Sequence, residues 1–101
     1  MFYIYILFSD KARKFYVGYS QDPWKRLFFH NQDNSHKYTG KFFDWKLSAV
    51  FEVSTSEADA IKLERFIKKQ KSRKLIIKLI HPEFIPTDAL AQLVRVPHVR
   101  D

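Results

Sequence analysis

The chain has 101 residues, which is enough for one small domain with a core of its own but too few for two. Its 18 Lys and Arg against 11 Asp and Glu give a formal net charge of +7, which favours polyanionic partners, nucleic acid first among them. The absence of cysteine excludes disulfides, thiol nucleophiles and cysteine-type zinc sites, and it is typical of a reducing compartment.

The N-terminus has the pattern of a β-hairpin. Residues 2–8 are rich in Tyr, Ile and Phe, a polar turn follows, and residues 15–20 return to a strand composition. Because residues 2–8 are apolar at almost every position, we expect a central strand that is covered on both faces. This apolar run is too short for a signal peptide or a membrane span, so we expect a cytoplasmic protein with no membrane contact.

Alternation along the first strand predicts two different faces. Tyr3, Tyr5 and Leu7 are expected on one face, and Ile4, Ile6 and Phe8 on the other. Gly18, inside the second strand, marks a point where backbone or substrate can approach closely.

A helix is predicted over residues 22–32, with Asp22 as its cap and Pro23 in its first turn. Arg26 and His30, four residues apart, fall on a common face of this helix. The side chains expected to face the sheet are Trp24, Leu27 and Phe28.

The middle of the chain is expected to complete the sheet. Residues 31–46 mix turn formers with aromatics and predict a loop, and residues 47–53 predict a third strand. Ser54 to Glu57 form a helix-start signal for a helix that extends to about residue 69. Its expected apolar stripe consists of Ala60, Leu63 and Ile67, extended by Ile61 and Phe66.

The C-terminal part predicts a third helix capped by Ser72 that ends before His81, and a possible short helix over residues 87–94 with Thr87 as its cap. Together the elements predict an α+β fold with a small three-stranded antiparallel sheet flanked by about three helices. Residues 1–81 are expected to form the domain. Residues 82–101, which contain three of the four prolines, form a docked or flexible tail that could contact a protein partner.

Two tripeptides in the hairpin, Tyr3-Ile4-Tyr5 and Tyr16-Val17-Gly18, resemble the signature of the GIY-YIG nuclease family. The resemblance covers residues 2 to about 80 and is strongest to compact single-domain bacterial members, which are similar to the nuclease domain of the excision-repair subunit UvrC. Tyr3 replaces the family's first glycine. Arg26 and His30 match the family's arginine and histidine, and Glu64 matches its metal-binding glutamate.

The resemblance implies a DNA endonuclease that uses Mg²⁺ or Mn²⁺, with Tyr5, Tyr16, Arg26, His30 and Glu64 as its catalytic set. Glutamate is a hard oxygen ligand for Mg²⁺, which binds few protein carboxylates, and the guanidinium of Arg26 suits the scissile phosphate. Tyr5 is assigned the role of general base, which requires a nearby cation or metal to lower its pKa. His30 could hold the Tyr5 hydroxyl or receive its proton, and Tyr16 would orient water or phosphate.

Each of these residues can also be interpreted as having a purely structural role. A tyrosine in an apolar strand usually belongs to the core, and Glu64 with Lys68 could be a solvated pair on a helix face. Some family members carry an asparagine well after the glutamate, whereas this chain has none beyond Asn34. The candidate nucleic-acid contacts are Lys25, Lys37, Tyr38, Lys41, Lys68 and Lys69, with Lys71 and Arg73 as further phosphate contacts.

The leading hypothesis is a metal-dependent DNA endonuclease with a preference for branched or single-stranded substrates, acting in repair or DNA processing. No separate recognition domain is apparent, so strong sequence specificity is not expected. Two alternatives stay open: a catalytically weak nucleic-acid-binding module, and a subunit that a partner directs to DNA.

Overall fold

The computed structural model describes residues 1–32 and 42–97 of the chain. The elements follow in the order β1 (Phe2–Ser9), β2 (Lys14–Ser20), α1 (Pro23–Gln32), β3 (Trp45–Ser54), α2 (Glu57–Lys69), α3 (Arg73–Ile80), a single 3-10 turn η1 (Asp88–Leu90) and β4 (Val94–Arg95). The predicted α+β fold, with an antiparallel sheet and three helices, is confirmed.

The sheet has four strands in the order β2-β1-β3-β4, so the prediction of three strands is wrong. The additional strand, Val94–Arg95, pairs antiparallel with Phe51 and Glu52 of β3. Two residues are too few to show alternation in a sequence, which explains why this strand was not predicted. The central position expected for the first strand is confirmed, because β1 pairs with β2 on one side and β3 on the other.

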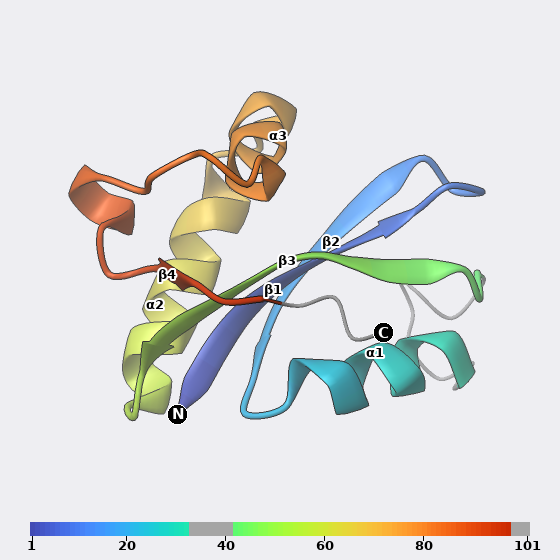
Figure 1. Cartoon of the computed structure of the whole chain (residues 1–101), viewed down its shortest axis with the longest axis horizontal. Coiled ribbons are helices and arrows are strands. Elements are labelled where there is room, and N and C mark those ends of the chain that lie inside the picture. The colour runs from blue at the N-terminus through green and yellow to red at the C-terminus, as the bar shows by residue number, and fades with distance from the viewer. Residues whose placement is uncertain (33–41, 98–101) are drawn as a thin grey trace.

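The two faces of the sheet are covered by different helices (Figure 1). Ile4 and Ile6 of β1 belong to one core cluster, into which α2, α3 and the chain after α3 pack. Tyr5 and Leu7 of β1 belong to the other, which is covered by α1. The predicted division of β1 into two faces is therefore confirmed, and the aromatic Tyr5 face is the one beneath α1.

Helix α1 confirms the Asp22 cap, because the Lys25 backbone N–H donates to Asp22 Oδ1 at 3.1 Å. The prediction that Phe28 faces the sheet is wrong, since its side chain is 60% exposed. His30 is buried instead, because it continues the sheet-facing side three residues after Leu27.

Asn31 ties α1 to the sheet immediately after His30. Its Oδ1 accepts from the Trp45 backbone N–H at 2.8 Å, and its Nδ2 donates to the Trp45 carbonyl at 3.0 Å. Trp45 and Lys46 belong to β3, so the predicted loop over residues 31–46 is wrong at both ends, where α1 and β3 extend into it. This amide bridge fixes the C-terminal end of α1 and therefore the height of His30 over the sheet.

Helices α2 and α3 have the predicted bounds, but Phe66, which was expected to extend the apolar stripe of α2, is exposed. Ala60, Leu63 and Ile67 are buried along α2, and the Ser72 hydroxyl caps α3 by accepting from the Leu75 backbone N–H at 3.1 Å. The expected helix over residues 87–94 is wrong. Only the single turn Asp88–Leu90 forms there, and the Thr87 side chain makes no cap hydrogen bond.

The chain after α3 returns to the sheet through Arg95. Its guanidinium donates to the carbonyls of Leu79 and His81 at 2.7 and 2.9 Å and lies 4.7 Å from the centroid of the Phe51 ring. Leu90 and Leu93 are buried in the same core cluster as α2. The carbonyls at the end of α3, which have no partner within the helix, are thus satisfied by the returning chain.

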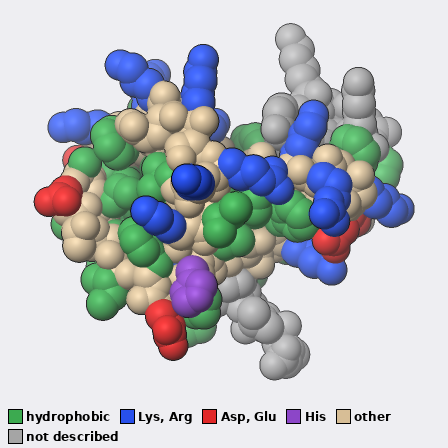
Figure 2. All heavy atoms as spheres, turned by 90° about the horizontal axis from the view of Figure 1, so that it is seen from above, with side chains coloured by type: hydrophobic (Ala, Val, Ile, Leu, Met, Phe, Trp, Pro, Cys, Tyr) green, Lys and Arg blue, Asp and Glu red, His purple; other side chains and the backbone are tan. Residues whose placement is uncertain are grey.

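Positive charge is concentrated on α2 and α3. Between Lys62 and Lys78 every charged side chain except Glu64 is a lysine or arginine. Figure 2 shows Lys and Arg side chains spread over the face that carries α3, with few Asp or Glu among them. Within residues 1–32 and 42–97, none of the helices has the length and hydrophobicity needed to cross a membrane.

Candidate active site

A polar cavity of about 440 Å³ brings together residues from β1, β2, α1 and α2. Four of the five predicted catalytic residues line it, namely Tyr5, Tyr16, Arg26 and Glu64, and the fifth, His30, contacts Tyr5 directly behind it. The remaining lining residues are Phe2, Gly18, Tyr19, Ser20, Gln21, Glu57 and Lys68.

The position of this cavity follows from the layers of the fold. Helix α1 packs on one face of the sheet and α2 on the other, so their side chains can meet only around an edge. Strand β2 is that edge, and it supplies Tyr16 and Gly18 to the cavity. Arg26 reaches the cavity from one face and Glu64 from the other, which places a cation and a carboxylate on opposite sides of one space.

Tyr5 and His30 form a buried hydrogen-bonded pair. The Tyr5 hydroxyl oxygen lies 3.1 Å from His30 Nε2, and each residue is only 1% exposed. The Tyr16 ring completes an aromatic cluster, with its centroid 4.7 Å from that of His30 and 6.3 Å from that of Tyr5. His30 therefore orients Tyr5 from behind, while Tyr5 itself lines the cavity.

Gly18 makes room for Tyr5. It is the partner of Tyr5 in the hairpin register, and a Cβ atom on Gly18 would lie 2.6 Å from the Tyr5 hydroxyl oxygen and 2.7 Å from Cζ. The close approach expected at Gly18 is therefore made by the Tyr5 side chain. Any larger residue would push the phenol away from its place beside His30.

The environment of Tyr5 favours the neutral phenol. Burial raises the pKa of Tyr5 to about 12, and the hydrogen bond from Arg26 lowers it by less than burial raises it. Coulombic interactions with Tyr16 and Glu64 raise it further, because a negative charge beside Tyr5 disfavours a second anion. Tyr5 consequently holds its proton at neutral pH unless additional positive charge enters the cavity.

Glu64 is paired with Lys68 on the same helix. Lys68 Nζ lies 3.1 Å from Glu64 Oε1, and the same ammonium is 5.4 Å from the centroid of the Tyr16 ring. The Glu64 side chain is 16% exposed, so this ion pair is partly shielded from water, whereas the lysine is 46% exposed. The Lys68 ammonium thus already offsets part of the negative charge that the carboxylates bring to the cavity.

Glu57 is a second carboxylate in the cavity and was not among the predicted site residues. It lies two helical turns before Glu64 and accepts a hydrogen bond from the Tyr19 hydroxyl at 3.3 Å. The seven-residue spacing on α2 was a usable signal, because residues so placed share a helix face. The sequence pattern places Glu57 in the first turn of α2 as part of a helix-start signal, and this interpretation concealed its place in the site.

The residues present fit a divalent metal that keeps most of its water. Among the residues that the structure describes, no group of three or more His, Cys, Asp or Glu could enclose an ion. Mg²⁺ is commonly bound by one or two carboxylates together with waters and substrate phosphate oxygens. Glu64 supplies such a hard oxygen ligand at the wall of a polar cavity, with Glu57 in the same lining.

The predicted nucleic-acid contacts are distributed unevenly around this cavity. Lys68 lines it, whereas Lys25 and Lys69 are exposed residues outside its lining. Lys25 Nζ lies 6.0 Å from the centroid of the Phe29 ring on the outer side of α1. The other three predicted contacts, Lys37, Tyr38 and Lys41, fall outside the described residues.

Comparison with known proteins gives one match and two negative results. The GIY-YIG catalytic domain family matches residues 1–76, which include every element from β1 to the middle of α3 and all five predicted catalytic residues. No curated protein and no solved structure matches the chain. On the strength of the family match, which spans most of the sequence, this chain belongs to the GIY-YIG family and is a nuclease that hydrolyses phosphodiester bonds.

Proposed function

We propose that this nuclease is a metal-dependent DNA endonuclease, with a preference for branched or single-stranded substrates, that acts in DNA repair or processing. One observation carries the proposal. A single polar cavity at the β2 edge contains a permanent cation, Arg26, a partly buried carboxylate, Glu64, and the oxygen of Tyr5, which is held by His30. These are the groups needed to bind a phosphodiester, a metal and an attacking water.

Arg26 binds the scissile phosphate. Its planar, positively charged guanidinium can donate two hydrogen bonds to phosphate oxygens. From the same position it lowers the pKa of Tyr5, against the larger effect of burial. Binding of the phosphate and preparation of the tyrosine therefore depend on one side chain.

Tyr5 accepts the proton of the attacking water and passes its own proton to His30. The 3.1 Å separation between the Tyr5 oxygen and His30 Nε2 permits this transfer when the imidazole is neutral at that nitrogen. The transfer avoids a free phenolate, which the raised pKa of Tyr5 makes costly. Tyr16, whose ring lies tilted against that of His30, positions the water or phosphate at the open side.

Glu64 holds the metal, either Mg²⁺ or Mn²⁺. A bound divalent ion supplies charge stabilisation for the phosphate oxygens and makes protons of nearby water easier to remove. Lys68 Nζ lies 3.1 Å from Glu64 Oε1, so a divalent ion bound at that oxygen would compete with the lysine. A displaced Lys68 would be available for a phosphate of the substrate.

The proposed preference for DNA of a particular structure, and not of a particular sequence, rests on the kind of contacts that the basic surface can make. The exposed Lys and Arg of α2 and α3 provide contacts to phosphate, which position a nucleic acid but carry no sequence information. Strong sequence specificity would need base contacts from a groove-reading element. A nucleic-acid-binding module of weak activity is the second candidate, favoured by the ion pair that occupies Glu64.

The test is a cleavage assay in Mg²⁺ and in Mn²⁺ on labelled single-stranded, branched and duplex DNA. Wild type is compared with Glu64→Ala and Arg26→Ala at protein concentrations that give equal DNA occupancy. Loss of cleavage in both variants supports the proposal. Binding by the wild type without cleavage of any substrate would favour the binding module, and equal cleavage of every DNA form would remove the substrate preference.

A further inference from the structure

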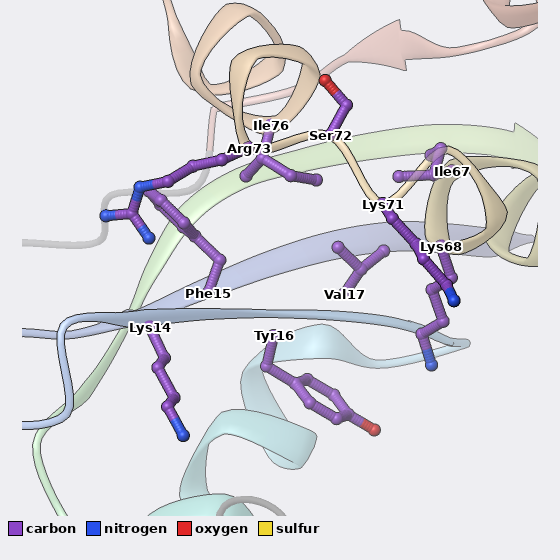
Figure 3. A pocket seen from close by; sticks show the side chains of 10 residues that line it. All are labelled: Lys14, Phe15, Tyr16, Val17, Ile67, Lys68, Lys71, Ser72, Arg73 and Ile76. Atoms are coloured by element: carbon purple, nitrogen blue, oxygen red, sulfur yellow. The ribbon is translucent and has the colours of Figure 1, made fainter.

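A second cleft, of about 600 Å³, adjoins the active site and shares Tyr16 and Lys68 with it (Figure 3). It lies between the edge strand β2 and the turn that joins α2 to α3. Its volume falls within the range of about 300–1,000 Å³ that is usual for small-molecule pockets. Because Tyr16 and Lys68 line both spaces, a chain-like ligand in the active site can continue into this cleft.

The cleft combines an apolar floor with a cationic rim. The floor is formed by Phe15, Val17, Ile67 and Ile76, and the rim by Lys14, Lys68, Lys71 and Arg73. No Asp or Glu is among the described residues that line it. Figure 3 shows Arg73 and Phe15 close together at one end, and Lys68 and Lys71 extending side by side at the other.

The Arg73 guanidinium lies over the Phe15 ring at the far end of the cleft. The guanidinium carbon lies 5.0 Å from the centroid of the Phe15 ring, and Arg73 Nη1 donates to the Arg13 carbonyl at 3.4 Å. Planar cations and aromatic rings are the two kinds of side chain on which nucleobases stack. The pair therefore offers a stacking surface with a positive charge next to it.

Lys71 is held in a conformation that is unusual for lysine. Its φ angle is 47°, in the left-handed region where glycine or asparagine is usual at a helix end. The residue follows Gln70, the C-cap of α2, and its backbone N–H donates to the Lys68 carbonyl at 3.2 Å. A glycine would relieve this backbone, so the lysine retains a side chain at a local conformational cost.

We infer that this cleft binds an unpaired nucleotide next to the scissile phosphate, with the base on the Phe15 surface and the neighbouring phosphates on Lys68, Lys71 and Arg73. The identity of the ligand rests on the proposed function, because a phosphodiester chain bound in the active site would pass Tyr16 and Lys68 to enter this cleft. A stacked base on an apolar floor requires that the base be unpaired. The cleft thus provides a physical basis for recognising a single-stranded segment.

The test is metal-free binding of fluorescent oligothymidylate, and of a blunt duplex of equal length, measured by anisotropy at fixed salt. The cleft variant carries Lys71→Asn and Arg73→Gln, since asparagine tolerates the left-handed backbone. The matched control carries Lys74→Gln and Lys78→Gln, which remove the same charge from exposed positions of α3 outside the cleft. A third variant, Phe15→Leu, keeps an apolar side chain but removes the ring.

We expect the cleft variant and Phe15→Leu each to weaken oligothymidylate binding about tenfold, while the control weakens it no more than about threefold. Blunt-duplex binding is expected to fall equally in the cleft and control variants. Equal loss of oligothymidylate binding in both charge variants, or unchanged binding by Phe15→Leu, overturns the inference. Because no metal or cleavage is involved, a wild type that fails to cut DNA would contradict the proposed function without altering this result.

Discussion

Gly18 and Tyr5 face each other across the hairpin of β1 and β2, and the phenol of Tyr5 occupies the space that a Gly18 side chain would fill. The glycine is needed for this reason, since a Cβ atom there would lie 2.6 Å from the tyrosine oxygen. The second tripeptide of the family signature therefore makes room for the last residue of the first. Tyr5 can therefore take its place beside His30 only because residue 18 is a glycine.

Gly18→Ala is predicted to impair cleavage more than folding. The methyl group would displace the Tyr5 ring and break its contact with His30, and a misplacement of this order can reduce the rate about 100-fold. The free energy of unfolding should fall by about 1–3 kcal/mol, as for other overpacked sites. Single-turnover cleavage and urea denaturation measure the two effects. A variant that cleaves at the wild-type rate would show that the position of Tyr5 does not matter.

Tyr5→Phe is predicted to change how stability depends on alkaline pH. Because folding raises the pKa of Tyr5 from 10.0 to about 12, the stability contributed by the neutral phenol is fully present below pH 10 and is lost as the pH rises through 12. Two pKa units correspond to about 2–3 kcal/mol. The wild type should therefore lose about this much more stability than Tyr5→Phe between pH 10 and 12 in urea denaturation. Parallel curves for the two proteins would refute the raised pKa.

Lys68→Met is predicted to separate metal binding from DNA binding. Removing the ammonium 3.1 Å from Glu64 relieves competition for the carboxylate, so the Mg²⁺ concentration for half-maximal cleavage should fall about two- to fivefold. The dissociation constant for DNA should rise at the same time, since a phosphate contact is lost. Lys69→Met, on the neighbouring exposed residue outside both clefts, is the control and should change the metal dependence little. An unchanged Mg²⁺ requirement in Lys68→Met would argue against competition at Glu64.

Arg95→Met is predicted to destabilise the fold by about 1.5–3 kcal/mol, because it leaves the carbonyls of Leu79 and His81 without their charged donor. Arg95→Lys should recover only part of the loss, since an ammonium lacks the planar fork that also stacks on Phe51. Urea denaturation measures the change, and Arg65→Met, at an exposed position of α2, should stay within about 0.5 kcal/mol of wild type. Stability equal to wild type in Arg95→Met would mean that the returning chain contributes nothing to the fold.

The sequence was informative where local patterns and tertiary packing agree. Phe2 to Phe8 is apolar on both faces, which predicted the central strand, and its alternation correctly separated Tyr5 from Ile4. The Asp22 and Ser72 caps were predicted because a short polar side chain before a helical pattern has a specific backbone partner.

The features that the sequence did not predict depend on contacts between residues that are far apart in the chain. Nothing local distinguishes Phe28 from His30 as the buried residue of α1, and the choice is made by Tyr5, which lies 25 residues earlier than His30 and bonds to it. Strand β4 depends on pairing with β3 and on Arg95 reaching back to α3. The meeting of Arg26 with Glu64 around the β2 edge likewise required the layers of the fold.

The most direct test of the active site is to compare Glu64→Gln with Glu57→Gln in single-turnover cleavage with Mg²⁺. Both changes remove one negative charge from the same helix face and the same cavity, so they match in charge and location. We predict that Glu64→Gln reduces the rate by at least about 100-fold and that Glu57→Gln stays within about fivefold of wild type. Equal losses in the two variants, or wild-type cleavage by Glu64→Gln, would contradict the assignment of Glu64 as the metal ligand.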